Sequence, residues 1–124
     1  MNATEQLLRD VYDAFNVRDV AAVLEKMHAN VDWPNGMEGG RVHGHRSVRE
    51  YWERQWRITD PHVEPLRIET DAAGLHVVTV HQVVRDLDGK VLLDRAVVHV
   101  YSFEDGLIHR MDIRETVSAE ATAR

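Results

Sequence analysis

Three glycine-containing turns divide the second half of the chain into four strand-like runs. The turn sequences are AAG, LDG and EDG, and an Asp-Gly pair between apolar runs is a strong hairpin signal. The runs are rich in β-branched residues, which favour strands, and they cover residues 63–71, 75–86, 90–103 and 107–116. We therefore expect an antiparallel meander in this half of the chain.

The first half of the chain has the spacing of amphipathic helices. Apolar side chains recur at helical intervals over 4–15, with Thr4 as the expected N-cap, and Asp19 is the expected N-cap of a second helix. The sequence VDWP predicts a short extended segment, and a third helix is expected over 47–58, before Pro61. Three helices followed by a meander predict an α+β fold, in which helices pack on one face of a curved antiparallel sheet.

Composition and length limit the expected partners and location. A chain of 124 residues without cysteine fits one domain over 1–124 in the reducing cytoplasm, with 118–124 as a flexible tail. The net charge of −6 argues against nucleic acid, and no run approaches the ~18 apolar residues of a membrane span. We expect neither a nucleic-acid nor a membrane partner.

The EDG turn decides which side chains of the last two strands share a face. A three-residue loop over 104–106 pairs His99 with Met111, whereas a two-residue turn pairs His99 with Asp112. We favour the three-residue loop, because it buries Met111 and Ile113 and leaves the charged residues around them in solvent.

The same loop length at LDG places His81 opposite Arg95 and gives the sheet a polar inner face. The expected inner face comprises His81, Arg95, Val97, His99, Tyr101, His109, Met111 and Ile113. So many polar groups are atypical of a core, so we interpret this face as the wall of a small-molecule pocket. The outer face carries an apolar stripe that predicts a homodimer: Val78, Val80, Val84, Ala96, Val98 and Val100.

The residues of this face predict acid–base chemistry without a cofactor. His99 and His81 are the expected acid and base, because imidazole exchanges protons near neutral pH. Arg95 or Tyr101 is expected to stabilise negative charge, and Asp112 is a candidate catalytic carboxylate. The alternatives are hydrogen-bonded core histidines, a structural ion pair for Arg95 and a solvated Asp112.

Aromatic residues outside the meander are the expected apolar walls of the pocket, with an ordinary core as the alternative. They are Tyr12, Phe15, Trp33, Tyr51, Trp52 and Trp56. The sequence HGH, with His43 and His45, lacks a third ligand at a useful spacing, so we expect neither a metal nor a cofactor.

Three segments of the chain resemble the nuclear transport factor 2-like superfamily, and its SnoaL-like branch in particular. They are DVYDAFNVRDVAAVLEKMHANVDWP, VHGHRSVREYW and HVYSFEDGLI, and the similarity extends over almost the whole chain. This branch is close to ketosteroid isomerases and limonene epoxide hydrolases. The resemblance implies a cone formed by a bent sheet and three helices, and frequent dimerisation through the outer face of the sheet. These motifs indicate a fold that hosts unrelated activities.

The catalytic residues of these relatives do not carry over to this chain. Ketosteroid isomerases have a general-base aspartate directly before a proline, and this chain has Trp33 at that position. The two residues that stabilise the oxyanion in those enzymes correspond to Val11, next to Tyr12, and His99 in this chain. The final-strand aspartate of cyclases and epoxide hydrolases corresponds to Ile113, one residue from Asp112. Epoxide hydrolases also place an aspartate two residues after an arginine, whereas Arg95 is followed there by valine. Steroid isomerisation by the family mechanism is therefore not expected.

Two hypotheses of function remain. The first is a small-molecule pocket protein that acts on an apolar or aromatic ligand by histidine-based proton transfer, as an isomerase, cyclase or hydrolase. The second is a non-catalytic ligand-binding or dimerisation module.

Overall fold

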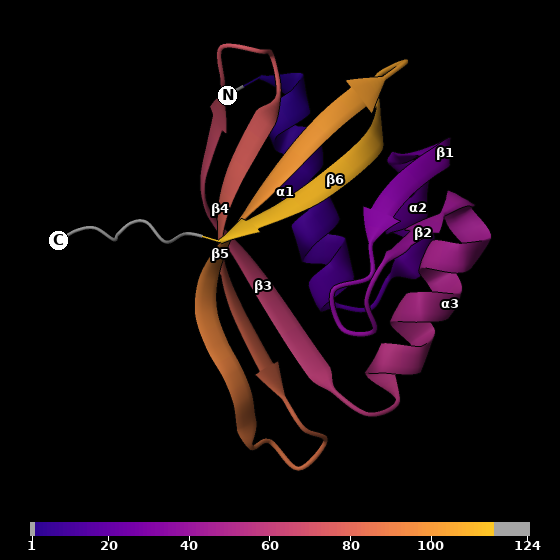
Figure 1. Cartoon of the computed structure of the whole chain (residues 1–124), viewed down its shortest axis with the longest axis vertical. Helices are drawn as coiled ribbons and strands as arrows, with labels where there is room; N and C mark the ends of the chain where they lie inside the picture. The colour runs from indigo at the N-terminus through magenta and orange to yellow at the C-terminus, as the bar shows by residue number, and fades with distance from the viewer. Residues whose placement is uncertain (1, 116–124) are drawn as a thin grey trace, which may run out of the picture.

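The computed structural model describes residues 2–115 of the chain, so the expected tail at 118–124 lies outside the described residues. Figure 1 shows three helices on one side of a strongly curved sheet. The helices are α1 (Ala3–Asn16), α2 (Val20–Glu25) and α3 (Gly44–Trp56). The strands are β1 (Met27–Pro34), β2 (Arg41–His43), β3 (Asp60–Thr70), β4 (His76–Arg85), β5 (Val91–Glu104) and β6 (Leu107–Glu115).

The α+β fold is confirmed, but the sheet is mixed and not wholly antiparallel. Its strand order is β2-β1-β6-β5-β4-β3, and β1 lies parallel to β6 while all other neighbours are antiparallel. The extended segment expected at VDWP is a full strand, and the second helix ends at Glu25 because the chain enters β1 at Met27. Within residues 2–115, no helix is both long enough and apolar enough to cross a membrane.

Local side-chain hydrogen bonds determine where the first two helices begin. The Asn2 side chain accepts a hydrogen bond of 2.7 Å from the Glu5 N–H, so Asn2 and not Thr4 is the N-cap of α1. The expected N-cap of α2 is confirmed, because Asp19 accepts a bond of 3.2 Å from the Ala22 N–H. Both helices then pack apolar side chains against the inner face of the sheet, in a core that includes Leu8, Val11, Val23, Val48, Val78, Val80 and Val97.

The β5–β6 turn differs from the expected one, yet it gives the expected faces. The turn has two central residues, Asp105 and Gly106, whose φ values of 55° and 78° are the pattern of a tight hairpin. Phe103 of β5 pairs with Ile108, but the preceding residue, Ser102, pairs with Arg110. His109 of β6 is therefore left unpaired as a one-residue bulge. The predicted three-residue loop is therefore wrong. The extra residue at the bulge changes the register by one, and this compensates for the shorter turn in deciding which side chains share a face.

Beyond this bulge, odd-numbered residues of β5 face odd-numbered residues of β6. His99 pairs with Ile113 and Tyr101 pairs with Met111, so the predicted pairing of His99 with Met111 is wrong by two residues. A shift of two residues leaves every side chain on the same face. The predicted grouping of His99, Tyr101, Met111 and Ile113 is therefore confirmed.

The β4–β5 pairing overturns the predicted face of β4. Near the turn Arg85 pairs with Val91, in the predicted register, but a bulge at Leu92 shifts all later pairs by one residue. His81 consequently pairs with Ala96 on the outer face, and Gln82 takes the predicted place opposite Arg95. The predicted outer stripe is wrong for its three β4 members, since Val78, Val80 and Val84 are buried on the inner face.

Candidate functional site: an aromatic pocket with a buried histidine

A cavity of about 120 Å³ lies between the helices and the inner face of the sheet. Its size is comparable with engineered apolar cavities of about 150 Å³ that bind benzene. All six aromatic residues expected as walls line it: Tyr12, Phe15, Trp33, Tyr51, Trp52 and Trp56. The remaining lining residues are Val11, Pro34, Gly36, Met37, Gln55, Thr59, Pro61, Val63, Gln82, Val84, Arg95, His99, Tyr101, Met111 and Ile113.

The indole of Trp52 organises the aromatic wall. Its ring centroid lies 5.6 Å from that of Trp33 at an interplanar angle of 90°, and 5.2 Å from that of Phe15 at 77°. Edge-to-face contacts of this kind stabilise aromatic pairs beyond their burial. The wall is therefore held in place by ring contacts between α1, β1 and α3, and it offers flat apolar surfaces to a ligand.

A chain of hydrogen bonds joins three buried polar side chains at one end of the cavity. Tyr12 Oη lies 2.8 Å from His99 Nδ1 and 2.8 Å from Tyr101 Oη. The three residues are at most 7% exposed, so each polar group depends on the others to satisfy its hydrogen bonds. Tyr12 comes from α1, whereas His99 and Tyr101 are neighbours on the inner face of β5.

Burial keeps all three groups of this chain uncharged at neutral pH. Burial, and to a lesser extent the nearby positive charge of Arg95, together lower the pKa of His99 from 6.5 to about 4. Burial likewise raises the pKa of Tyr12 and that of Tyr101. The imidazole is therefore neutral at pH 7, with one ring nitrogen a donor and the other an acceptor.

The proton positions in this chain have two consistent arrangements. When Tyr12 donates to His99 Nδ1, the imidazole proton lies on Nε2, which then donates to a ligand. When Nδ1 donates to Tyr12, Nε2 is an acceptor and Tyr12 donates to Tyr101. Within residues 2–115 no side chain bonds to Nε2, so this nitrogen is the one that a ligand can reach.

Arg95 brings a positive charge to the wall of the cavity. Its Nε donates a hydrogen bond of 3.1 Å to Gln82 Oε1, and both side chains line the cavity. Among residues 2–115, no carboxylate forms an ion pair with Arg95. The described residues therefore do not form the structural ion pair that was the alternative for Arg95. The positive charge of Arg95 is available to an anionic ligand.

The structure places three other predicted residues outside the cavity. His81 lies on the outer face, where its Nε2 is 2.7 Å from Asp94 Oδ1, so its predicted place beside His99 is wrong. His109 lies at the bulge, with its Nε2 3.3 Å from Glu104 Oε1. Val97 is buried in the core, and it does not line the cavity.

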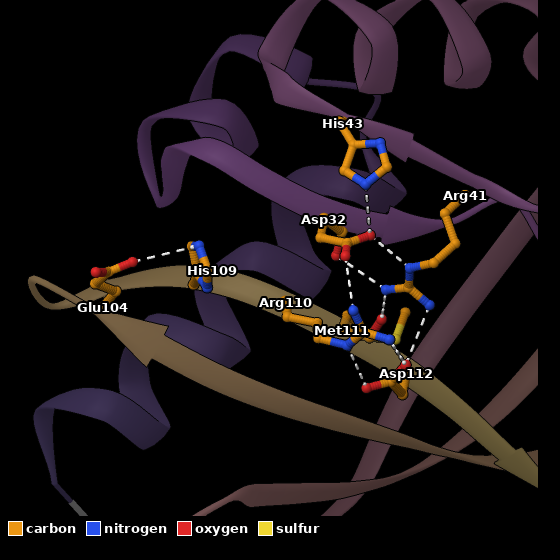
Figure 2. A network of polar contacts seen from close by, with 8 residues as sticks. All are labelled: Asp32, Arg41, His43, Glu104, His109, Arg110, Met111 and Asp112. Carbon is orange, nitrogen blue, oxygen red and sulfur yellow. Dashed lines mark hydrogen bonds and ion pairs between the residues drawn. The ribbon is translucent and has the colours of Figure 1, made fainter.

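Asp112 belongs to an ion network at the edge of the sheet (Figure 2). It accepts hydrogen bonds of 2.9 Å from Arg110 Nε and 3.1 Å from Arg41 Nη1, and both arginines also pair with Asp32. The bond from Arg110 is the main cause of the lowered pKa of Asp112. A carboxylate stabilised in this way stays charged, which suits a structural role and not a proton donor.

The loop over 35–40 closes one side of the cavity, where Gly36 and Met37 contribute to the lining. Glu38 anchors this loop to α3, because it accepts hydrogen bonds of 2.9 Å from Arg54 Nη2 and 3.0 Å from Gln55 Nε2. The Arg54 bond is the main reason that the pKa of Glu38 falls to about 2. The sequence analysis missed this anchor and also Gln82, whose place depends on the bulge at Leu92.

A family model described as a SnoaL-like domain matches residues 8–111 of the chain. The chain belongs to the SnoaL-like family. No curated protein matches it. Solved structures nevertheless match this SnoaL-like chain over nearly its whole length.

Three of these structures illustrate the range of the fold. An NTF2-like protein of unknown function from Burkholderia pseudomallei has 26% identity and a TM-score of 0.80, over 99% of this chain and 100% of that one. TerC, co-crystallised with polyporic acid, has 24% identity and a TM-score of 0.79, over 97% of each chain. An LEH-like epoxide hydrolase from M. tuberculosis has 16% identity and a TM-score of 0.70, over 89% of this chain and 80% of that one. The expected NTF2-like fold is therefore confirmed.

The lowered pKa of His99 predicts how the stability of this SnoaL-like domain depends on pH. The folded-state pKa of about 4 lies below the ordinary 6.5, so the unfolded chain binds the proton more readily between these values. Stability due to this group is complete above pH 6.5 and is lost as the pH falls towards 4. The linked loss is about 3 kcal/mol, at about 1.36 kcal/mol per unit.

We expect the free energy of unfolding of the wild type to fall by about 3 kcal/mol more than that of His99→Gln between pH 7 and pH 4. Urea denaturation at a series of pH values measures both proteins. Parallel pH profiles for the two would contradict the burial of a neutral imidazole at position 99.

Proposed function

We propose that this SnoaL-like domain binds an aromatic or otherwise apolar small molecule that carries an anionic group. The flat part of the ligand packs against Trp33 and Trp52, its polar end reaches His99, and its negative charge pairs with Arg95. The observation that carries the proposal is a guanidinium without a carboxylate partner among the described residues, in the wall of an aromatic-lined cavity. An anion here gains a charge-assisted hydrogen bond next to a region of low dielectric constant.

The hydrogen-bonded chain also supports proton transfer without a cofactor. Burial is the main cause of the lowered pKa of His99, and the charge of Arg95 is the lesser one; a ligand anion that pairs with Arg95 offsets the lesser cause, so binding raises this pKa in part. With the imidazole proton on Nδ1, Nε2 accepts a proton from a C–H bond of the ligand and becomes an imidazolium nitrogen, while Nδ1 still donates to Tyr12 and Tyr12 donates to Tyr101. The electron pair of that C–H bond stays on the ligand as an enolate-like intermediate, whose negative charge the new imidazolium stabilises while Arg95 remains paired with the anionic group. His81 has no part in this scheme.

A non-catalytic ligand carrier is the second candidate function. In the free protein the pKa of His99 is about 4, which makes the imidazole a weak base at neutral pH. The catalytic residues of better-known relatives are also replaced here, with Trp33 in place of one general base. TerC, which shares the fold, was co-crystallised with a small molecule, which is compatible with either function.

The charge of Arg95 predicts selectivity for anions. We expect Arg95→Gln to weaken binding of 1-naphthoate by about tenfold or more, because a charge-assisted hydrogen bond contributes about 1.5–3 kcal/mol. Binding of the neutral 1-naphthamide should change by less than about twofold. Quenching of tryptophan fluorescence measures both, because Trp33, Trp52 and Trp56 line the cavity.

The matched control is Arg67→Gln, which removes an exposed arginine outside the cavity that pairs with Glu69. It should leave both affinities unchanged. An equal loss of naphthoate and naphthamide binding in Arg95→Gln, or no loss of either, would contradict the role of Arg95.

Replacement of His99 separates catalysis from carriage. A thermal-shift screen of aromatic acids identifies ligands, and NMR of each ligand after incubation with the protein shows whether it is altered. Catalysis predicts an altered ligand with the wild type and an unaltered one with His99→Gln. Recovery of every bound ligand unchanged from the wild type would favour the carrier.

We also propose that two copies of the domain associate through the outer face of the sheet. The apolar residues there are fewer than expected: Ala96, Val98 and Val100 remain of the predicted stripe, and Val77 and Val83 join them from β4. Val83 and Val100 are already buried within the single chain, so Val77, Ala96 and Val98 supply the accessible apolar surface. The resemblance to families that dimerise by this face supports the proposal.

Sedimentation velocity at micromolar concentration should therefore show a dimer, and Val98→Arg should shift it towards monomer by placing a charge in the interface. Arg46→Gln, which changes an exposed arginine on α3 and not on the outer face of the sheet, serves as the surface control. A monomer in the wild type at this concentration would count against the proposal.

A further inference from the structure

Three metal-binding side chains meet at the end of the sheet where β5 turns into β6. His28 comes from β1, Glu104 ends β5, and His109 is the bulged residue of β6. Ile108 N–H donates to Lys26 O at 2.9 Å, which holds the start of β1 beside β6 and brings His28 next to His109. Figure 2 shows His109 directed at Glu104, away from the network around Asp112.

The distances in this cluster are close to those of a metal site. His109 Nε2 lies 3.3 Å and His28 Nε2 lies 3.8 Å from Glu104 Oε1, and the ligand atoms of all three residues lie within 4.8 Å of one another. Zinc–ligand bonds of about 2.0–2.2 Å in a tetrahedron separate neighbouring ligand atoms by about 3.4 Å. Small side-chain rotations are therefore enough to close the cluster around an ion.

Among the described residues, no arginine or lysine pairs with the carboxylate of this cluster. Among residues 2–115, Glu104 forms ion pairs only with the two histidines, whereas Asp32, Glu38 and Asp112 pair with arginines. Asp105 Oδ2 lies 3.7 Å from His28 Nε2 and adds a second oxygen beside the site. His109 is 40% exposed and Glu104 55%, so an ion has access from solvent.

We propose that His28, His109 and Glu104 form a binding site for a divalent transition-metal ion such as Zn²⁺. Two imidazoles and one carboxylate are a typical ligand set for this class of ion, with a remaining position for water or Asp105. This site is separate from the cavity, since none of its three residues lines it.

Binding changes one hydrogen bond of the free protein. His28 Nδ1 accepts a bond of 3.0 Å from the exposed Asn30 N–H. When Nε2 binds the metal, the ring proton occupies Nδ1, and water replaces that bond to Asn30. The exchange affects the exposed, irregular part of β1 between Met27 and Asp32, and it leaves the pairs of Met27 and Asp32 with β6 intact.

Isothermal titration of the full chain with ZnCl₂ tests the site. We expect one equivalent of Zn²⁺ to bind to the wild type, and His28→Gln and His109→Gln each to weaken its binding by about tenfold or more. Mg²⁺ should not bind, because it prefers an all-oxygen ligand set. Circular dichroism and thermal unfolding verify that each variant is folded.

The matched control is His62→Gln, which removes a histidine whose Nε2 lies 3.2 Å from Glu64 Oε1 on β3. Among residues 2–115, His62 belongs to no cluster of three metal-binding side chains. This variant should bind Zn²⁺ like the wild type. Unchanged binding in folded His28→Gln and His109→Gln would overturn the proposal, as would the absence of saturable binding to the wild type.

Discussion

The inward orientation of His99 is the constraint on which the site depends. It results from two one-residue bulges, at Leu92 and His109, that set the register of β5 against its two neighbours. Side chains alternate between the two faces of a strand. A register shift of one residue at either bulge would therefore place side chains from the other face of β4 or β6 beside His99. The bulges thus decide which polar groups enter the cavity and which remain in solvent.

The buried histidine then depends on Tyr12 from α1. An isolated imidazole in an apolar wall would lose its hydrogen bonds to water without replacement. The hydroxyl of Tyr12 satisfies Nδ1 and is itself satisfied by Tyr101, so one side chain of the helix links two side chains of the sheet. This arrangement leaves Nε2 and the charge of Arg95 as the polar features that a ligand meets. The same end of β5 supplies Glu104 to the proposed metal site.

Sequence reasoning recovered the helices, the meander and the aromatic walls, because these depend on local periodicity and on short turn motifs. It assigned the faces of β5 and β6 correctly, although their pairing was wrong by two residues, because the error in loop length and the missed bulge at His109 each changed the register by one residue. It misplaced His81 because the bulge at Leu92 has no local signal, such as a glycine, that would distinguish it from regular strand. The His28–Glu104–His109 cluster depends on three separate strands, so it too required the register.

The central claim is that His99 is a buried, neutral imidazole hydrogen-bonded through Nδ1. NMR of the ¹⁵N-labelled imidazole of His99 tests it most directly, by following both ring nitrogens from pH 8 to pH 5.5. The account predicts no titration in this range, because burial and Arg95 lower the pKa of His99 to about 4. A midpoint near 6.5, with the averaged nitrogen shifts of a solvated ring, would contradict it.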